Sequence, residues 1–170
     1  MSDVKVYDSV FPASWRNSAY TFVRNSLYSI GWSDTNEIDT QNVAYLHSNY
    51  DQNDIKTLGF FEAIQCDELK RKIEGLAIKK CVVNLSTPTE THFAHTHEGV
   101  TLLYYVNLRW REEWAGETIF YNDDISEVEF TSMYKPGRVV LFDGSIPHTF
   151  RPQSGSAPDY RFTISIQFEP

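Results

Sequence analysis

From Lys79 onward the chain alternates apolar and polar residues in a series of short segments, and this series constrains the fold more than any other feature. Asn, Asp, Pro and Gly, the residues that favour turns, separate the segments. The predicted strands span residues 79–85, 100–108, 117–121, 127–130, 137–142, 148–151 and 161–168. Short strands at this regular spacing indicate an antiparallel sandwich or jelly roll.

Residues before position 79 follow a helical period instead. Apolar residues recur at helical spacing from Trp15 to Ile30, with Ser14 as a candidate N-cap and Gly31 as a candidate stop. Residues 67–75 predict a second helix, because acidic residues begin the segment and a glycine ends it. These helices are expected to cover one face of the larger sheet.

The segment between the two predicted helices, residues 33–54, is rich in Asn, Asp, Ser and Thr and is expected to be mainly loop. Residues 43–47 form a possible short strand or turn within it. The expected architecture is therefore mainly β with N-terminal helices. We expect a single domain over 1–170, in which residues 1–78 form a helical and loop support region and residues 79–170 form the jelly-roll core.

Composition excludes several classes of protein. The chain has 170 residues, and a hydrophobic content of 41% argues against disorder, while no apolar run reaches the roughly 18 residues of a membrane span. A net charge of −8 argues against a nucleic-acid partner. Two cysteines, Cys66 and Cys81, and a start without a basic or apolar signal segment favour a reducing cytoplasm.

Three histidines provide the strongest functional signal. His95 and His97 are two residues apart, so on a strand they point to the same face, and a folded-back strand can bring His148 to the same place. Three nitrogen ligands on one side of an octahedral ion leave the other positions open. That arrangement is typical of non-haem Fe(II) oxygenases.

The last predicted strand has one polar and one apolar face. Arg161, Thr163, Ser165 and Gln167 alternate with Phe162, Ile164, Ile166 and Phe168. The polar face is either an outward surface or the lining of a site. An arginine suits the second interpretation, because its planar fork donates two parallel hydrogen bonds to a carboxylate and keeps its charge.

At these residues the chain resembles the 2-oxoglutarate/Fe(II)-dependent oxygenases, most closely the prolyl-4-hydroxylase-like branch common in bacteria and phages. The resemblance extends from about Lys79 to Phe168. Its motifs are His95-Thr96-His97 for the family's His-x-Asp, residues 102–107 for its LYYLN strand, Ala115–Phe120 for GGETxF, residues 136–143, Pro147-His148 and Arg161-x-Thr163. Each motif is weak alone, but their order is specific.

The resemblance implies a double-stranded β-helix, that is, a cupin-like jelly roll with helices on its major sheet. It implies His95, His97 and His148 as iron ligands, Arg161 and Thr163 as the clamp for the distal carboxylate of 2-oxoglutarate, and Tyr105 as a residue that reaches the cosubstrate. The expected cofactors are Fe(II), 2-oxoglutarate and O₂, with ascorbate as an additional reductant. The expected reaction hydroxylates a C–H bond of a protein, a peptide or a small molecule. The expected protein is a monomer or homodimer in the cytoplasm of a bacterial or phage-infected cell.

One residue departs from the family pattern, since His97 occupies the position of the family's aspartate ligand. This change removes a negative charge from the metal site. Glu98 could supply a carboxylate instead if Gly99 allows the chain to turn, although on a regular strand Glu98 points away. His97 is the preferred interpretation. The bulk of the His97 side chain also argues against a halogenase.

Other residues keep two interpretations each. Asp143 either orients the imidazole of His148 or serves only in a turn. His92 is a surface residue or a neighbour of the site, and Trp110 and Trp114 either pack in the core or line the entrance. Three functions remain: a 2-oxoglutarate-dependent hydroxylase, a three-histidine dioxygenase that does not use 2-oxoglutarate, and an inactive jelly roll that acts as a binding or structural module.

Overall fold

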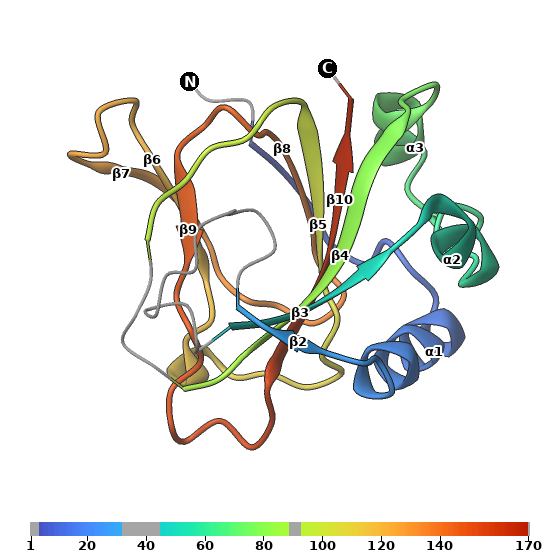
Figure 1. Cartoon of the computed structure of the whole chain (residues 1–170), viewed down its shortest axis with the longest axis horizontal. Helices are drawn as coiled ribbons and strands as arrows, with labels where there is room; N and C mark the ends of the chain where they lie inside the picture. The colour runs from blue at the N-terminus through green and yellow to red at the C-terminus, as the bar shows by residue number, and fades with distance from the viewer. Residues whose placement is uncertain (1–3, 32–44, 89–92, 170) are drawn as a thin grey trace.

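A computed structural model describes residues 4–31, 45–88 and 93–169, and within them two antiparallel sheets face each other (Figure 1). The larger sheet has seven strands in the order β1-β8-β5-β10-β4-β3-β2, and the smaller has three in the order β7-β6-β9. The strands are β1 (Lys5–Tyr7), β2 (Ser29–Ile30), β3 (Tyr45–Tyr50), β4 (Ile78–Ser86), β5 (Val100–Tyr105), β6 (Thr118–Tyr121), β7 (Val128–Ser132), β8 (Val139–Asp143), β9 (His148–Phe150) and β10 (Arg161–Phe168). The predicted jelly roll is confirmed.

Three helices, α1 (Ala13–Arg24), α2 (Gln52–Thr57) and α3 (Asp67–Ile73), cover the outer face of the larger sheet (Figure 1). Helix α1 buries Trp15, Ala19 and Val23, which are four residues apart and therefore share one face. They join a core cluster with the apolar side of β10, from Phe162 to Phe168. Within the described residues, no helix has the length and apolar content needed to cross a membrane.

A second, smaller core cluster lies between the two sheets. It contains Tyr105, Phe120, Tyr134, Val140 and Phe142, all of them buried. The Tyr134 hydroxyl donates to Asn107 Oδ1 and is 2.6 Å from both that atom and the Phe162 carbonyl oxygen. These contacts connect the segment before β8 with β5 and β10, and so hold the strands that carry the site.

The first predicted helix is shorter than its apolar period indicated. Helix α1 ends at Arg24 with Asn25 as its C-cap, and Ser14 is not its N-cap, because Pro12 holds that position without a side-chain hydrogen bond. Leu27 and Ile30 are exposed, at 90% and 74% of their surface, so neither continues the buried stripe. Ile30 instead belongs to β2, which pairs with β3.

Within the described part of residues 33–54, the expected loop is wrong beyond residue 47, whereas the possible short strand over residues 43–47 is present from Tyr45 as part of β3. Strand β3 begins at Tyr45 and pairs with β4 along its length, and helix α2 follows at once. The side chain of Asp51 caps α2 by accepting from the amides of Asn53 and Asp54, and Asp54 accepts from the Asp51 amide in return. This Asp-x-x-Asp capping box was a readable signal. Residues 32–44 lie outside the described part of the chain.

A candidate metal centre and anion pocket

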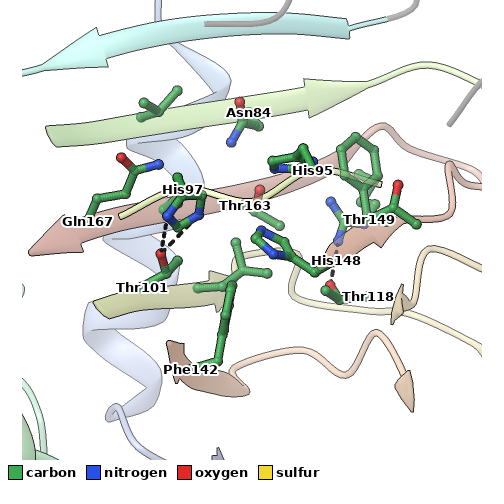
Figure 2. A pocket seen from close by; sticks show the side chains of 15 residues that line it. Asn84, His95, His97, Thr101, Thr118, Phe142, His148, Thr149, Thr163 and Gln167 are labelled. Carbon is green, nitrogen blue, oxygen red and sulfur yellow. Dashed lines mark hydrogen bonds between the residues drawn. The ribbon is translucent and has the colours of Figure 1, made fainter. Parts of the chain in front are cut away.

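One pocket between the two sheets collects the histidines and the arginine singled out in the sequence. Its walls come from strands of both sheets and from the segment that crosses to β5 (Figure 2). The residues that line it are Val82, Asn84, His95, His97, Thr101, Leu103, Thr118, Phe142, His148, Thr149, Phe150, Arg161, Thr163, Ser165 and Gln167.

His95 and His148 are direct partners across an antiparallel bridge. The amide of each donates to the carbonyl oxygen of the other at 3.0 Å, and their rings lie 4.4 Å apart between centroids. Residues opposite each other in such a pair carry their side chains on the same face. The fold-back predicted from the sequence is therefore made by main-chain hydrogen bonds.

His97 comes two residues later and turns its ring toward the same space. Its ring centroid lies 6.2 Å from that of His95 and 5.1 Å from that of His148. Thr101 Oγ1 lies 3.2 Å from His97 Nε2, as the dashed lines in Figure 2 show. The His97 amide donates to the Gly144 carbonyl at 2.9 Å, which fixes the segment at its base.

The three imidazoles fit a single cation. One ring nitrogen from each of His95, His97 and His148 lies within 4.8 Å of the others. Bonds of about 2.1 Å place nitrogens on one ion roughly 3 to 4 Å apart, so small rotations of the side chains are sufficient to close the site. Within the described residues no carboxylate belongs to this group, so an all-nitrogen donor set faces the ion.

The imidazole of His148 is held neutral with one defined tautomer. Its Nδ1 lies 2.7 Å from the Ile146 carbonyl oxygen, which can only accept, so Nδ1 carries the proton and Nε2 presents a lone pair. Burial chiefly, and then the charge of His95, lower the pKa of His148 to about 3, while the Ile146 carbonyl opposes the shift. The imidazole is therefore unprotonated at neutral pH, as metal binding requires.

Two alternatives from the sequence are not supported by the contacts. The Glu98 side chain is 79% exposed and pairs with Lys79 at 3.2 Å, away from the histidines. Asp143 does not contact the His148 ring; its Oδ1 accepts from the Ser145 amide at 2.9 Å, so it serves in the turn. The Ile146 carbonyl orients His148 instead. His92 lies outside the described residues.

Arg161 is buried at the other side of the pocket, with 2% of its surface exposed. Its Nε donates to the Gly116 carbonyl at 2.7 Å, and the guanidinium lies over the rings of Phe150 and Tyr134, at 4.6 and 5.1 Å from their centroids. Among the described residues, no carboxylate forms an ion pair with it. Burial lowers the pKa of Arg161, against opposing effects of three tyrosines and of the Glu117 carboxylate, so burial of this charge is costly here.

Thr163 follows Arg161 on the same face of β10 and is also buried, facing the pocket. Tyr105 does not line the pocket. Its hydroxyl donates to Thr118 Oγ1 at 2.8 Å, and Thr118 in turn accepts from Arg161 Nη2 at 3.4 Å. Tyr105 therefore acts on the pocket through Thr118 and through its ring, whose centroid lies 5.7 Å from the guanidinium carbon of Arg161. Trp110 packs on Tyr134 and donates to the Ala115 carbonyl, so it belongs to the core.

The polar face of β10 lines the pocket and is not an outer surface. Arg161, Thr163, Ser165 and Gln167 all face the pocket, while the apolar residues between them pack beneath the helices. The usual rule of polar residues outside is reversed, because the helices cover the outer face of this sheet. The sequence reasoning missed Asn84, Thr101 and Thr118. Asn84 was detectable in the sequence, because it interrupts an apolar run on β4. In the structure it is opposite Thr163.

Comparisons with known proteins show solved structures that share this fold. No protein-family model matches the sequence, and no curated protein matches it. A Pseudomonas putida prolyl-4-hydroxylase is similar in structure, with a TM-score of 0.73 and 16% identity over 100% of this chain and 94% of that chain. A Trichoplax adhaerens prolyl hydroxylase was solved with a peptide fragment of the hypoxia inducible factor. It has a TM-score of 0.73 and 17% identity over 99% of this chain and 84% of that chain. HygX from Streptomyces hygroscopicus was solved with nickel and 2-oxoglutarate. It has a TM-score of 0.69 and 10% identity over 99% of this chain and 83% of that chain.

Proposed function

We propose that this protein is an Fe(II)- and 2-oxoglutarate-dependent oxygenase that hydroxylates a C–H bond. The observation that carries the proposal is the pairing, in one pocket, of three convergent imidazoles with a buried arginine that has no carboxylate partner among the described residues. The first feature suits a cation and the second suits an organic anion. The fold shared with prolyl hydroxylases supports the same interpretation.

His95, His97 and His148 would hold Fe(II) through neutral nitrogens. The main-chain bridge between His95 and His148, and the carbonyl that fixes the His148 ring, position two of these ligands before any metal arrives. When bound, the iron with 2-oxoglutarate and O₂ supplies the oxidation of the cosubstrate to succinate and CO₂ and of a substrate C–H to an alcohol. The protein contributes position, charge and exclusion of water.

Arg161 would bind the distal carboxylate of 2-oxoglutarate. The Nε of its guanidinium is occupied by the Gly116 carbonyl, and the rings of Phe150, Tyr134 and Tyr105 hold its plane. Its other edge remains for a carboxylate, with Thr163 beside it on β10 as a hydroxyl donor. Tyr105 would support the clamp indirectly. Burial raises its pKa, so its phenol stays neutral and keeps its hydrogen bond to Thr118.

The proposed substrate is a protein or peptide, with a small molecule as the second class. The Trichoplax relative was solved with a peptide fragment, whereas HygX was solved with hygromycin B in another structure. The cysteines Cys66 and Cys81 are both free, which is consistent with the cytoplasmic location proposed here. No nucleic acid is proposed as a partner, because the chain has a net charge of −8.

Conversion of 2-oxoglutarate to succinate tests this function. Purified protein is incubated with Fe(II), ascorbate, 2-oxoglutarate and air, and succinate and O₂ uptake are measured together. We expect succinate from the parent and none from His148→Ala. His47→Ala is the matched control, because His47, on β3, contacts the Gly31 carbonyl and does not line the pocket. O₂ uptake without succinate would indicate a three-histidine dioxygenase, and neither signal in an iron-loaded protein would indicate an inactive binding module.

A further inference from the structure

Gly144 lies directly against the ring of His97. A Cβ built on Gly144 would lie 2.2 Å from His97 Nδ1 and 2.5 Å from His97 Cε1. Non-bonded carbon and nitrogen atoms do not approach that closely, since good contacts begin at about 3.5 Å. Any other residue at position 144 therefore competes with the imidazole for the same space.

The need for glycine here is one of space and not of backbone conformation. Unlike Gly99, whose φ is 78°, Gly144 does not have a positive φ. Its backbone conformation is open to any residue, so the constraint comes from neighbouring atoms of His97, chiefly two atoms of its ring and also its carbonyl oxygen. The sequence gives no sign of this, because position 144 reads only as the glycine of a turn.

The backbone around Gly144 cannot easily move aside. The His97 amide donates to the Gly144 carbonyl at 2.9 Å, and the Gly144 amide donates to the Gly99 carbonyl at 2.7 Å. Just before it, Asp143 is in register with Val100 at the junction of β8 and β5. A side chain at position 144 would therefore be relieved mainly by displacement of the His97 ring.

Thr101 also contacts the ring. Its hydroxyl lies 3.2 Å from His97 Nε2, and the residue is buried with 2% of its surface exposed. The imidazole thus lies beside the backbone of Gly144 and contacts the Thr101 hydroxyl. These contacts orient the His97 ring, whose Nδ1 also lies 3.4 Å from the Glu98 carbonyl oxygen.

We propose that Gly144 is a positioning residue for the metal centre: its lack of a side chain provides the space in which the His97 imidazole reaches the ion. The proposal rests on the three-histidine site proposed above. It explains how the chain accommodates an imidazole at a position where the resembled family has an aspartate. Gly144 touches neither metal nor substrate, and it acts only through His97.

The test is a double-mutant cycle read out as Co(II) affinity by calorimetry. The four proteins are the parent, Gly144→Ala, His97→Ala and the double variant, with Gly155→Ala as the matched control because a Cβ there meets nothing within 4 Å. We expect Gly144→Ala to weaken Co(II) binding at least about tenfold in the parent. The same change should have no further effect once His97→Ala has removed the ring. The Gly155→Ala protein should bind like the parent.

Three outcomes would overturn the proposal. The first is parent-like affinity of a folded Gly144→Ala protein, and the second is an equal loss in the His97→Ala background. The third concerns folding, because the added Cβ would also lie 2.7 Å from the His97 carbonyl oxygen, a contact common to both backgrounds. Thermal melts separate the two contacts: recovery of folding in the double variant supports the ring clash, and failure in both backgrounds contradicts it. A parent that binds no Co(II) would instead refute the metal site itself.

Discussion

His95 and His148 form a reciprocal main-chain pair, in which each amide donates to the other's carbonyl oxygen at 3.0 Å. The pair joins the segment that precedes β5 to the first residue of β9, so two proposed ligands are positioned by strand pairing. Because the hydrogen bonds belong to the backbone, the side chains can be removed without breaking the bridge. This separates effects on metal binding from effects on the fold.

We expect His95→Ala and His148→Ala each to abolish the binding of one Fe(II) per chain while the protein stays folded. Each change removes one of three nitrogens that converge within 4.8 Å but leaves the main-chain bridge. Metal analysis after gel filtration, with circular dichroism for folding, measures the effect. His47→Ala should keep its iron. Unchanged iron in both pocket variants would remove the proposed site.

The His97 and Glu98 interpretations give opposite rankings of variants. We expect His97→Ala to lose most of its iron and its 2-oxoglutarate turnover, and Glu98→Ala to be mild, because Glu98 pairs with Lys79 at the surface. His97→Asp should keep both properties, since a carboxylate can replace the nitrogen ligand. The measurements are iron affinity and succinate formation without added substrate. Loss of iron on Glu98→Ala, with His97→Ala unaffected, would reverse the assignment.

Arg161→Ala should weaken 2-oxoglutarate binding and leave metal binding nearly intact. Loss of a buried charged partner costs about 2–5 kcal/mol, which corresponds to an increase of about 30-fold or more in the KM for 2-oxoglutarate. The KM of Arg161→Lys should lie between those of the parent and of Arg161→Ala, because lysine keeps the charge but not the planar fork. Arg109→Ala, at an exposed position, is the control. A normal KM in Arg161→Ala would mean that the anion clamp lies elsewhere.

Asp8 makes the fold sensitive to acid. Its carboxylate accepts from Arg138 Nε at 2.8 Å and from Lys135 Nζ at 2.7 Å. Arg138 chiefly, and then Lys135, lower the pKa of Asp8 to about 2, against a smaller opposing effect of burial. Because the folded-state pKa is depressed, the stabilisation is full above the ordinary pKa of 3.8 and is lost as pH falls toward about 2.

We therefore expect Asp8→Asn to lower the free energy of unfolding by about 1 kcal/mol at pH 7. This figure is below the full value of the pKa shift because the carboxylate is 36% exposed and screened by solvent. The difference should shrink between about pH 4 and pH 2. Urea unfolding across this range measures it, with Asp123→Asn as the control. A constant difference at all pH values would show that the ion pair is not its source.

The strands could be predicted from the sequence because their alternation is local. Seven predicted strands appear in the structure with small changes at their ends, and the polar face of β10 faces inward because helices cover the opposite face. The end of α1 could not be read in the same way. Leu27 and Ile30 fit the helical period, but the pairing of β2 with β3, a tertiary contact, decides their conformation.

For the candidate site, the sequence could predict which residues come together. His95 and His97 lie on no named strand, but main-chain hydrogen bonds to His148 and Gly144 hold their segment. The predicted gathering of these residues with His148 and Arg161 in one pocket matches the structure. Their roles as ligands and clamp stay predictions. Contacts between distant turns were beyond reach, as the fit of Gly144 against His97 shows. The same limit applies to Asp143, where a backbone carbonyl takes the role considered for a side chain.

Metal-dependent binding of 2-oxoglutarate tests the central claim most directly. Calorimetry without O₂ would titrate 2-oxoglutarate into the Fe(II)-loaded parent, the metal-free parent and Fe(II)-loaded Arg161→Ala. The account predicts one 2-oxoglutarate per chain in the loaded parent, with much weaker binding when either the metal or the guanidinium is missing. An iron-loaded parent that binds no 2-oxoglutarate, or one that binds it equally well without metal, would contradict the account.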